Sequence, residues 1–166
     1  MPVNDHITES GKGTASQTDQ IRLMSGPYNL NTYILTCGQT GASVIIDPGG
    51  TAADLAAVLK THGQKPAYLL LTHGHADQFF SASEFKEFFD IPYCLHRADD
   101  DFFSDPRVRE DTFNAVKLPP PHPADIRLED QETLRFGNAS VKVIHTPGHT
   151  PGSVCFLRDS HLYTGD

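Results

Sequence analysis

The feature that most constrains this chain is the stretch Tyr68–Gln78, in which a short apolar run ends in two histidines and an aspartate. An apolar run of this length, bounded by turn residues, is typical of a fully buried strand. His73, His75 and Asp77 follow it at alternating positions. If the backbone stays extended through them, their side chains leave the same side of the chain. The stretch therefore predicts a metal site at the rim of a sheet.

Two further clusters follow other apolar runs and strengthen this interpretation. They are His145–Ser153 and Tyr163–Asp166. A single His-x-His pair is weak evidence in a chain with nine histidines, because histidine also caps helices and packs in cores. Histidine combined with aspartate, however, is a ligand set that zinc prefers. Three strand ends that carry such groups are hard to explain by packing alone.

These three motifs resemble those of the metallo-β-lactamase superfamily, and within it the glyoxalase II-like (hydroxyacylglutathione hydrolase-like) hydrolases and their persulfide dioxygenase relatives. The resemblance runs from about residue 21 to residue 166. The first family motif, Thr-His-x-His-x-Asp-His, matches residues 72–78, except that Gln78 stands in place of the last histidine. The second motif matches His145–Thr150 in full, and the Gly-Asp motif is Gly165–Asp166.

The resemblance implies an α/β (α+β) fold, the αββα metallo-β-lactamase sandwich, with the metals at one edge. It also implies that His73, His75 and His149 form the first metal site. Asp166 would be the carboxylate that bridges to a second metal. The family continues with further strands and a helix after Gly-Asp, so we expect the sandwich of this chain to be incomplete at its C-terminus.

The second metal site is where this sequence departs from the family. By resemblance, Asp77 belongs to that site, but Gln78 offers only a neutral, weak carboxamide ligand. A further family histidine, which would come after Gly-Asp, has no counterpart in this chain. We therefore expect one tightly bound Zn²⁺ and an impaired second site.

Three neutral imidazoles would leave zinc an open position for water, and the metal lowers the pKa of that water from about 16 to about 7. Asp166 could aim the resulting nucleophile at a carbonyl, and Asp77 could do so if the second metal is absent. Resemblance to glyoxalase II implies a small-molecule thioester of the hydroxyacylglutathione type as the substrate. Two alternatives stay open: a mononuclear persulfide dioxygenase with Fe²⁺ on His73, His149 and Asp166, and a degenerate or non-catalytic metal-binding domain.

Bulk properties narrow the partners and the compartment. The net charge is −8 and no basic run occurs, which disfavours nucleic acid as a partner. No apolar run approaches the ~18 residues of a membrane span. Cys37, Cys94 and Cys155 are isolated from one another in sequence, which indicates reduced thiols rather than a disulfide framework. We expect a soluble cytoplasmic protein, and the sequence leaves its oligomeric state open.

The rest of the chain predicts one domain over residues 21–166, truncated after the Gly-Asp motif, with a flexible N-terminal tail over residues 1–20. A helix is predicted over Thr51–His62, capped by Thr51, and a second over Ser81–Phe89. Gly137-Asn138 predicts a hairpin between two alternating runs. A polyproline-like segment is predicted over Leu118–Pro123.

Several polar residues near the motifs have more than one interpretation. Asp47 could orient a ligand histidine, or it could simply form a turn before Pro48. His96 and His145 are interpreted as structural or supporting residues rather than metal ligands. Thr150 is expected to act as a capping or hydrogen-bond donor next to His149.

Overall fold

The computed structural model describes residues 19–26, 29–108 and 123–166, without the side chains of residues 19 and 76–80. The predicted tail therefore lies mostly outside the described residues, as does most of the predicted polyproline-like segment. The elements, in chain order, are β1 (Asp19–Ser25), β2 (Leu30–Thr36), β3 (Ala42–Ile46), α1 (Ala52–Thr61), β4 (Lys65–Leu70), α2 (Ala76–Phe89), β5 (Tyr93–His96), α3 (Arg97–Ser104), β6 (Ile126–Leu128), β7 (Thr133–Phe136), β8 (Ala139–His145), β9 (Val154–Arg158) and β10 (His161–Tyr163).

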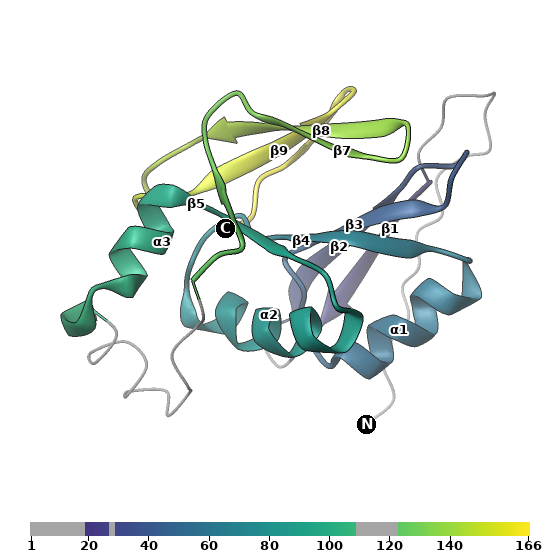
Figure 1. Cartoon of the computed structure of the whole chain (residues 1–166), viewed down its shortest axis with the longest axis horizontal. Helices are drawn as coiled ribbons and strands as arrows, with labels where there is room; N and C mark the ends of the chain where they lie inside the picture. Colours follow the sequence, from purple (N-terminus) through teal and green to yellow (C-terminus); the bar gives the residue numbers. More distant parts are fainter. Residues whose placement is uncertain (1–18, 27–28, 109–122) are drawn as a thin grey trace.

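The strands form two sheets that lie face to face (Figure 1). The larger sheet has the order β1-β2-β3-β4-β5-β6, and the smaller one has the order β10-β9-β8-β7. From β3 to β6 the pairs of the larger sheet are parallel. Parallel pairing brings the carboxyl ends of β3, β4 and β5 to one edge of the sheet. Ligands of open α/β sheets bind outside such an edge, and the histidine motif that follows β4 lies there.

Two hydrophobic cores lie on opposite faces of the larger sheet, because successive side chains of a strand point to opposite faces. Ile45 of β3 and Leu69 of β4 pack with Leu55, Leu59 and Phe85 of the helices. Neighbouring residues of the same strands pack instead against the smaller sheet. They are Val44, Ile46 and Leu70, which meet Val141, Val143, Val154 and Phe156. Runs that are apolar at every position are therefore explained by strands buried on both faces.

The helices α1 and α2 cover the outer face of the larger sheet, as Figure 1 shows. The helix predicted from Thr51 is confirmed: the Thr51 hydroxyl accepts a hydrogen bond from the Asp54 amide and caps α1. Gly63 follows α1 at φ +64°, as a helix-ending glycine does. The second helix is longer than predicted, since α2 begins at Ala76 rather than Ser81.

The arrangement confirms a mixed α/β sandwich of packed sheets and helices. Within the described residues, no helix lies over the outer face of the smaller sheet (Figure 1). The predicted hairpin at Gly137 is confirmed by the antiparallel pairing of β7 and β8. None of the helices in the described part of the chain is both long enough and apolar enough to cross a membrane.

Candidate metal centre

Three histidines from two loops converge at the sheet edge. His73 and His75 lie between β4 and α2, and His149 lies between β8 and β9. One ligand atom from each lies within 4.8 Å of the others. The ring centroids are 4.8, 4.7 and 4.5 Å apart, and the rings are nearly perpendicular to one another. Zinc bonds of about 2.0–2.1 Å would place the nitrogens roughly 3.4 Å apart. Small side-chain rotations therefore suffice, and the three residues fit a shared cation.

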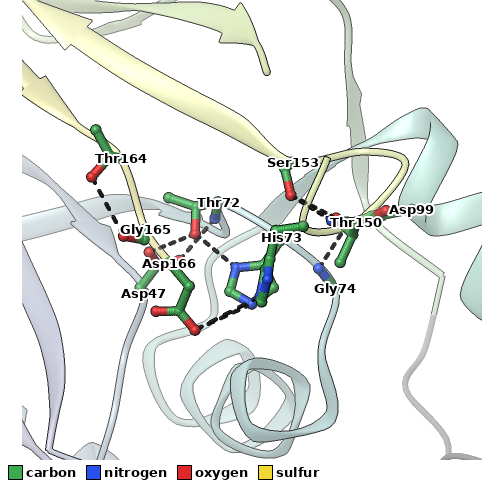
Figure 2. Close-up of polar contacts among 11 residues, drawn as sticks. Asp47, Thr72, His73, Gly74, Asp99, Thr150, Ser153, Thr164, Gly165 and Asp166 are labelled. Atoms are coloured by element: carbon green, nitrogen blue, oxygen red, sulfur yellow. Dashed lines mark hydrogen bonds and ion pairs between the residues drawn. The ribbon is translucent and has the colours of Figure 1, made fainter. Parts of the chain in front are cut away.

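Asp166 brings a carboxylate to the same point from the segment after β10. Its Oδ2 atom lies 3.9 Å from His73 Nε2 (Figure 2). The same atom lies 3.8 Å from His149 Nε2. His73 is buried, whereas about half of the Asp166 side chain is exposed. An anionic oxygen thus lies beside the three imidazoles, and carboxylate oxygens are among the groups that bind zinc. The geometry thus brings together four of the five predicted ligands.

Asp77 is the fifth predicted ligand, and the geometric reason given for it is wrong. The backbone is extended at His75 but helical from Ala76 onward, with His75 at the N-cap of α2. The three alternating residues therefore do not share one extended segment. Asp77 instead lies in the first turn of α2. Its side chain and that of Gln78 lie outside the described part of the chain, so the interpretation of a second metal site stays a prediction.

A chain of hydrogen bonds from Asp47 sets the tautomer of His73. Buried Asp47 accepts the Thr72 amide at 2.8 Å through Oδ1 and the Thr72 hydroxyl at 2.8 Å through Oδ2 (Figure 2). The Thr72 oxygen also lies 3.1 Å from His73 Nδ1. Since the single hydroxyl proton goes to Asp47, the Thr72 oxygen must accept a proton from Nδ1. The lone pair of His73 is then on Nε2, the atom that faces Asp166.

The sequence interpretation missed Asp99, which lies in the first turn of α3 and is fully buried. Its carboxylate accepts hydrogen bonds from the Gly74 amide and the Thr150 hydroxyl (Figure 2). It also accepts one from the Gly152 amide. Thr150 is therefore a donor, as expected. The available signal was the position of Asp99 just beyond β5, the strand that pairs with β4. That signal is informative only once β5 is known to lie beside β4 in the sheet.

His96 and His145 lie outside the group of three histidines and stack on each other, with ring centroids 4.1 Å apart and an interplanar angle of 15°. His96 Nδ1 accepts the Ala98 amide and caps α3. His145 Nε2 lies 3.0 Å from the Pro151 carbonyl oxygen. Burial lowers the pKa of His96, and the neighbouring His145 lowers it further. These contacts are those of residues that support the loops.

The comparisons with known proteins agree with this geometry. A family model described as the metallo-beta-lactamase superfamily matches residues 25–166. The probable metallo-hydrolase YqgX of Bacillus subtilis is 31% identical over 142 residues, a match that covers 85% of this chain and 66% of YqgX. The crystal structure of the BLEG-1 B3 metallo-beta-lactamase has a TM-score of 0.71 at 32% identity, covering 84% of this chain and 66% of that one.

A second solved structure, TTHA1623 in a di-iron-bound form, has a TM-score of 0.66 at 31% identity and covers 82% of this chain and 66% of that one. The chain thus spans 66% of the length of each of these three proteins. The family match includes every residue of the centre, from His73 to Asp166. With the fold and the family model in agreement, the chain belongs to the metallo-β-lactamase superfamily.

Proposed function

We propose that this chain carries the metal centre of a hydrolase that directs an activated water at a thioester of the hydroxyacylglutathione type. The observation that carries the proposal is the convergence of His73, His75 and His149 within 4.8 Å, beside the Asp166 carboxylate. Three imidazoles that leave one position open are the ligand set of catalytic rather than structural zinc.

Each residue of the centre has a distinct part in this proposal. A cation held by the three histidines would supply an acidified water and would polarise the substrate carbonyl. Asp166 is half exposed, so its carboxylate can reach both solvent and substrate, accept the proton of that water and orient it. Thr72 holds His73 in the tautomer that presents Nε2. Asp77 is the alternative proton acceptor if only one metal binds.

The choice of a thioester draws on the names of two relatives. A hydroxyacylglutathione hydrolase of Anaeromyxobacter dehalogenans is 30% identical over 135 residues, which cover 44% of that protein. BaeB of Bacillus velezensis, a probable polyketide biosynthesis zinc-dependent hydrolase, is 26% identical over 150 residues. Both names support hydrolysis, and the second supports zinc. All three cysteines are free and buried, which supports a reducing, cytoplasmic setting.

We further propose that one metal binds tightly and a second binds weakly, because Gln78 replaces an imidazole with a carboxamide. Elemental analysis of the purified chain after equilibration with zinc tests this stoichiometry. Two tightly bound equivalents would reject it. The di-iron form of TTHA1623 makes iron the competing metal, so the protein as isolated should be analysed for both elements.

The test of the function is hydrolysis of a lactoylglutathione thioester by the zinc-loaded chain. His73→Ala should lower kcat/KM at least about 100-fold, because the water is activated only by a metal that is held in place. His62→Ala is the matched control, since His62 is exposed at the end of α1. Equal rates in the wild-type and His73→Ala proteins would favour a non-catalytic domain.

A β-lactam should be assayed in parallel, because BLEG-1 is a β-lactamase by name. Turnover of the β-lactam alone would overturn the thioester assignment and leave the metal centre intact. Oxygen consumption with a small persulfide, dependent on iron, would instead establish the dioxygenase alternative.

A further inference from the structure

The histidines of the centre lie on two loops that have no regular secondary structure. His73 and His75 belong to residues 71–75, and His149 belongs to residues 146–153. One backbone hydrogen bond joins the bases of the loops, from the Val154 amide to the Thr72 carbonyl at 2.8 Å. That bond lies before the first histidine and after the last. It does not by itself hold the tips of the loops, where the imidazoles are.

Asp99 makes the connection at the tips. Its Oδ2 atom accepts the Gly74 amide at 2.8 Å and the Thr150 hydroxyl at 2.7 Å. Its Oδ1 atom accepts the Gly152 amide at 2.6 Å. Gly74 lies between the two histidines of the first loop, and Thr150 directly follows His149. A single carboxylate therefore fixes the spacing between the backbone segments that carry all three imidazoles.

The surroundings of Asp99 leave its carboxylate little freedom. The residue is fully buried, and it lies in the first turn of α3, where a negative charge is favoured by the helix dipole. A Cβ added to Gly152 would come within 2.5 Å of the Asp99 amide nitrogen and 2.7 Å of its Cγ atom. The loop that carries His149 thus packs tightly against Asp99, and Gly152 lies where the two approach most closely.

The adjacent residue, Asp100, provides a natural comparison. It is also buried and also lies in the first turn of α3. Its carboxylate, however, accepts the Ala124 amide at 2.8 Å and pairs with Arg127 at 3.2 Å. These partners belong to β6 and the residues before it, not to the histidine loops. Burial and helix position are therefore shared by the two aspartates, and only Asp99 joins the loops.

We propose that Asp99 is a positioning residue that fastens the two histidine loops to each other and so sets the geometry of the metal centre. This inference rests on the proposed metal function of His73, His75 and His149. Asp99 acts through the backbone and Thr150, since its two oxygens already accept three hydrogen bonds. Partners of this kind behind a metal site change metal affinity about 10–100-fold when they are replaced.

The test compares zinc affinity in a set of matched variants of the purified chain. Asp99→Asn should lower the affinity about 10–100-fold, because an amide cannot accept hydrogen bonds through both of its ends. Asp100→Asn should keep the wild-type affinity even if it costs similar stability. Thr150→Val, which removes one hydroxyl, should lower the affinity, and Thr150→Ser should restore it. If Asp99→Asn does not fold, the zinc affinities of Thr150→Val and Thr150→Ser still test whether the bond between Asp99 and Thr150 positions the centre.

Amide hydrogen exchange on the metal-free chain gives a second readout. At least one of the Gly74 and Gly152 amides should exchange faster in Asp99→Asn than in Asp100→Asn, since an asparagine keeps only one of the two oxygens that accept them. Wild-type affinity in Asp99→Asn, an equal loss in Asp100→Asn, or equal affinities in the two Thr150 variants would overturn the proposal. Failure of the wild-type chain to bind zinc would instead refute the metal centre, and the exchange data would still decide whether Asp99 joins the loops.

Discussion

Replacing Thr72 by valine tests the hydrogen-bond chain behind His73 with almost no change in shape. The Thr72 side chain is buried, and its hydroxyl both donates to the Asp47 carboxylate and accepts from His73 Nδ1. Valine keeps the branched volume and removes both interactions. The buried carboxylate then loses one of its donors, and His73 loses the contact that fixes its tautomer.

The expected loss of unfolding free energy depends on whether each lost hydrogen bond involves an ionised group. A hydrogen bond to an ionised group contributes about 1.5–3 kcal/mol, and a neutral one about 1 kcal/mol. The valine variant should therefore lose about 3 kcal/mol of unfolding free energy. For a chain of this length, that corresponds to a fall in Tm of roughly 6–12 °C. Zinc affinity should fall about 10–100-fold, because Nε2 is no longer the preferred site of the lone pair.

Thermal unfolding of the metal-free protein measures the first effect, and a competitive zinc titration measures the second. Thr61→Val is the control: it also removes a threonine hydroxyl, but one that is exposed on α1 and donates to the Ala57 carbonyl. Its unfolding free energy should change by no more than about 0.5 kcal/mol. If the two valine variants unfold at the same temperature, Thr72 does not carry the connection between Asp47 and His73.

Three further outcomes are expected. Gly165→Ala should destabilise the chain more than Gly63→Ala does. Both glycines have φ +64°, but only a Cβ added at Gly165 would clash with the Thr72 hydroxyl oxygen. Equal Tm values for the two variants would contradict this contact. A chelator should lower the Tm of zinc-loaded wild-type protein but not that of His75→Ala, because a ligand at 100 times its Kd adds about 2.7 kcal/mol; the same fall in both proteins would place the ion elsewhere. Burial lowers the pKa of His96 below its ordinary 6.5, so the folded protein favours the neutral ring. The stability gained in this way is complete above pH 6.5. It is lost as the pH falls from 6.5 toward the lower pKa of the folded state. The Tm of His96→Asn should accordingly fall less steeply than that of wild-type over this range, and parallel curves would show that this ring does not contribute.

Local chemistry was enough to predict several helices, strands and turns, whereas the sandwich arrangement was implied by the family resemblance. The cap at Thr51 and the glycine at position 63 delimit α1, since both act on neighbouring backbone groups. Apolar runs ending at turn residues located β3 and β4, and Gly137 located the hairpin of β7 and β8. In each case the forces that shape the element act within a few residues of it.

The start of α2 shows where local patterns stop being sufficient. Alternation of His73, His75 and Asp77 is compatible with an extended chain, but the same residues are also compatible with a loop that enters a helix at Ala76. A pattern of five residues is too short to distinguish the two-residue repeat of a strand from the 3.6-residue repeat of a helix. The outcome is set by packing, since Ala82 and Phe85 of α2 are buried against the larger sheet.

The same limit explains why Asp99 was missed and why it matters. Its partners Gly74, Thr150 and Gly152 are 25, 51 and 53 residues away in the sequence, so no local signal connects them. Asp47 is likewise 25 residues from Thr72. Parallel strand order brings both carboxylates to the edge at which His73 and His75 lie, one after β3 and the other after β5. The loop that follows β4 is therefore held from both sides by buried carboxylates. A loop fixed in this way has less conformational entropy to lose when a cation binds, which favours affinity without any additional ligand.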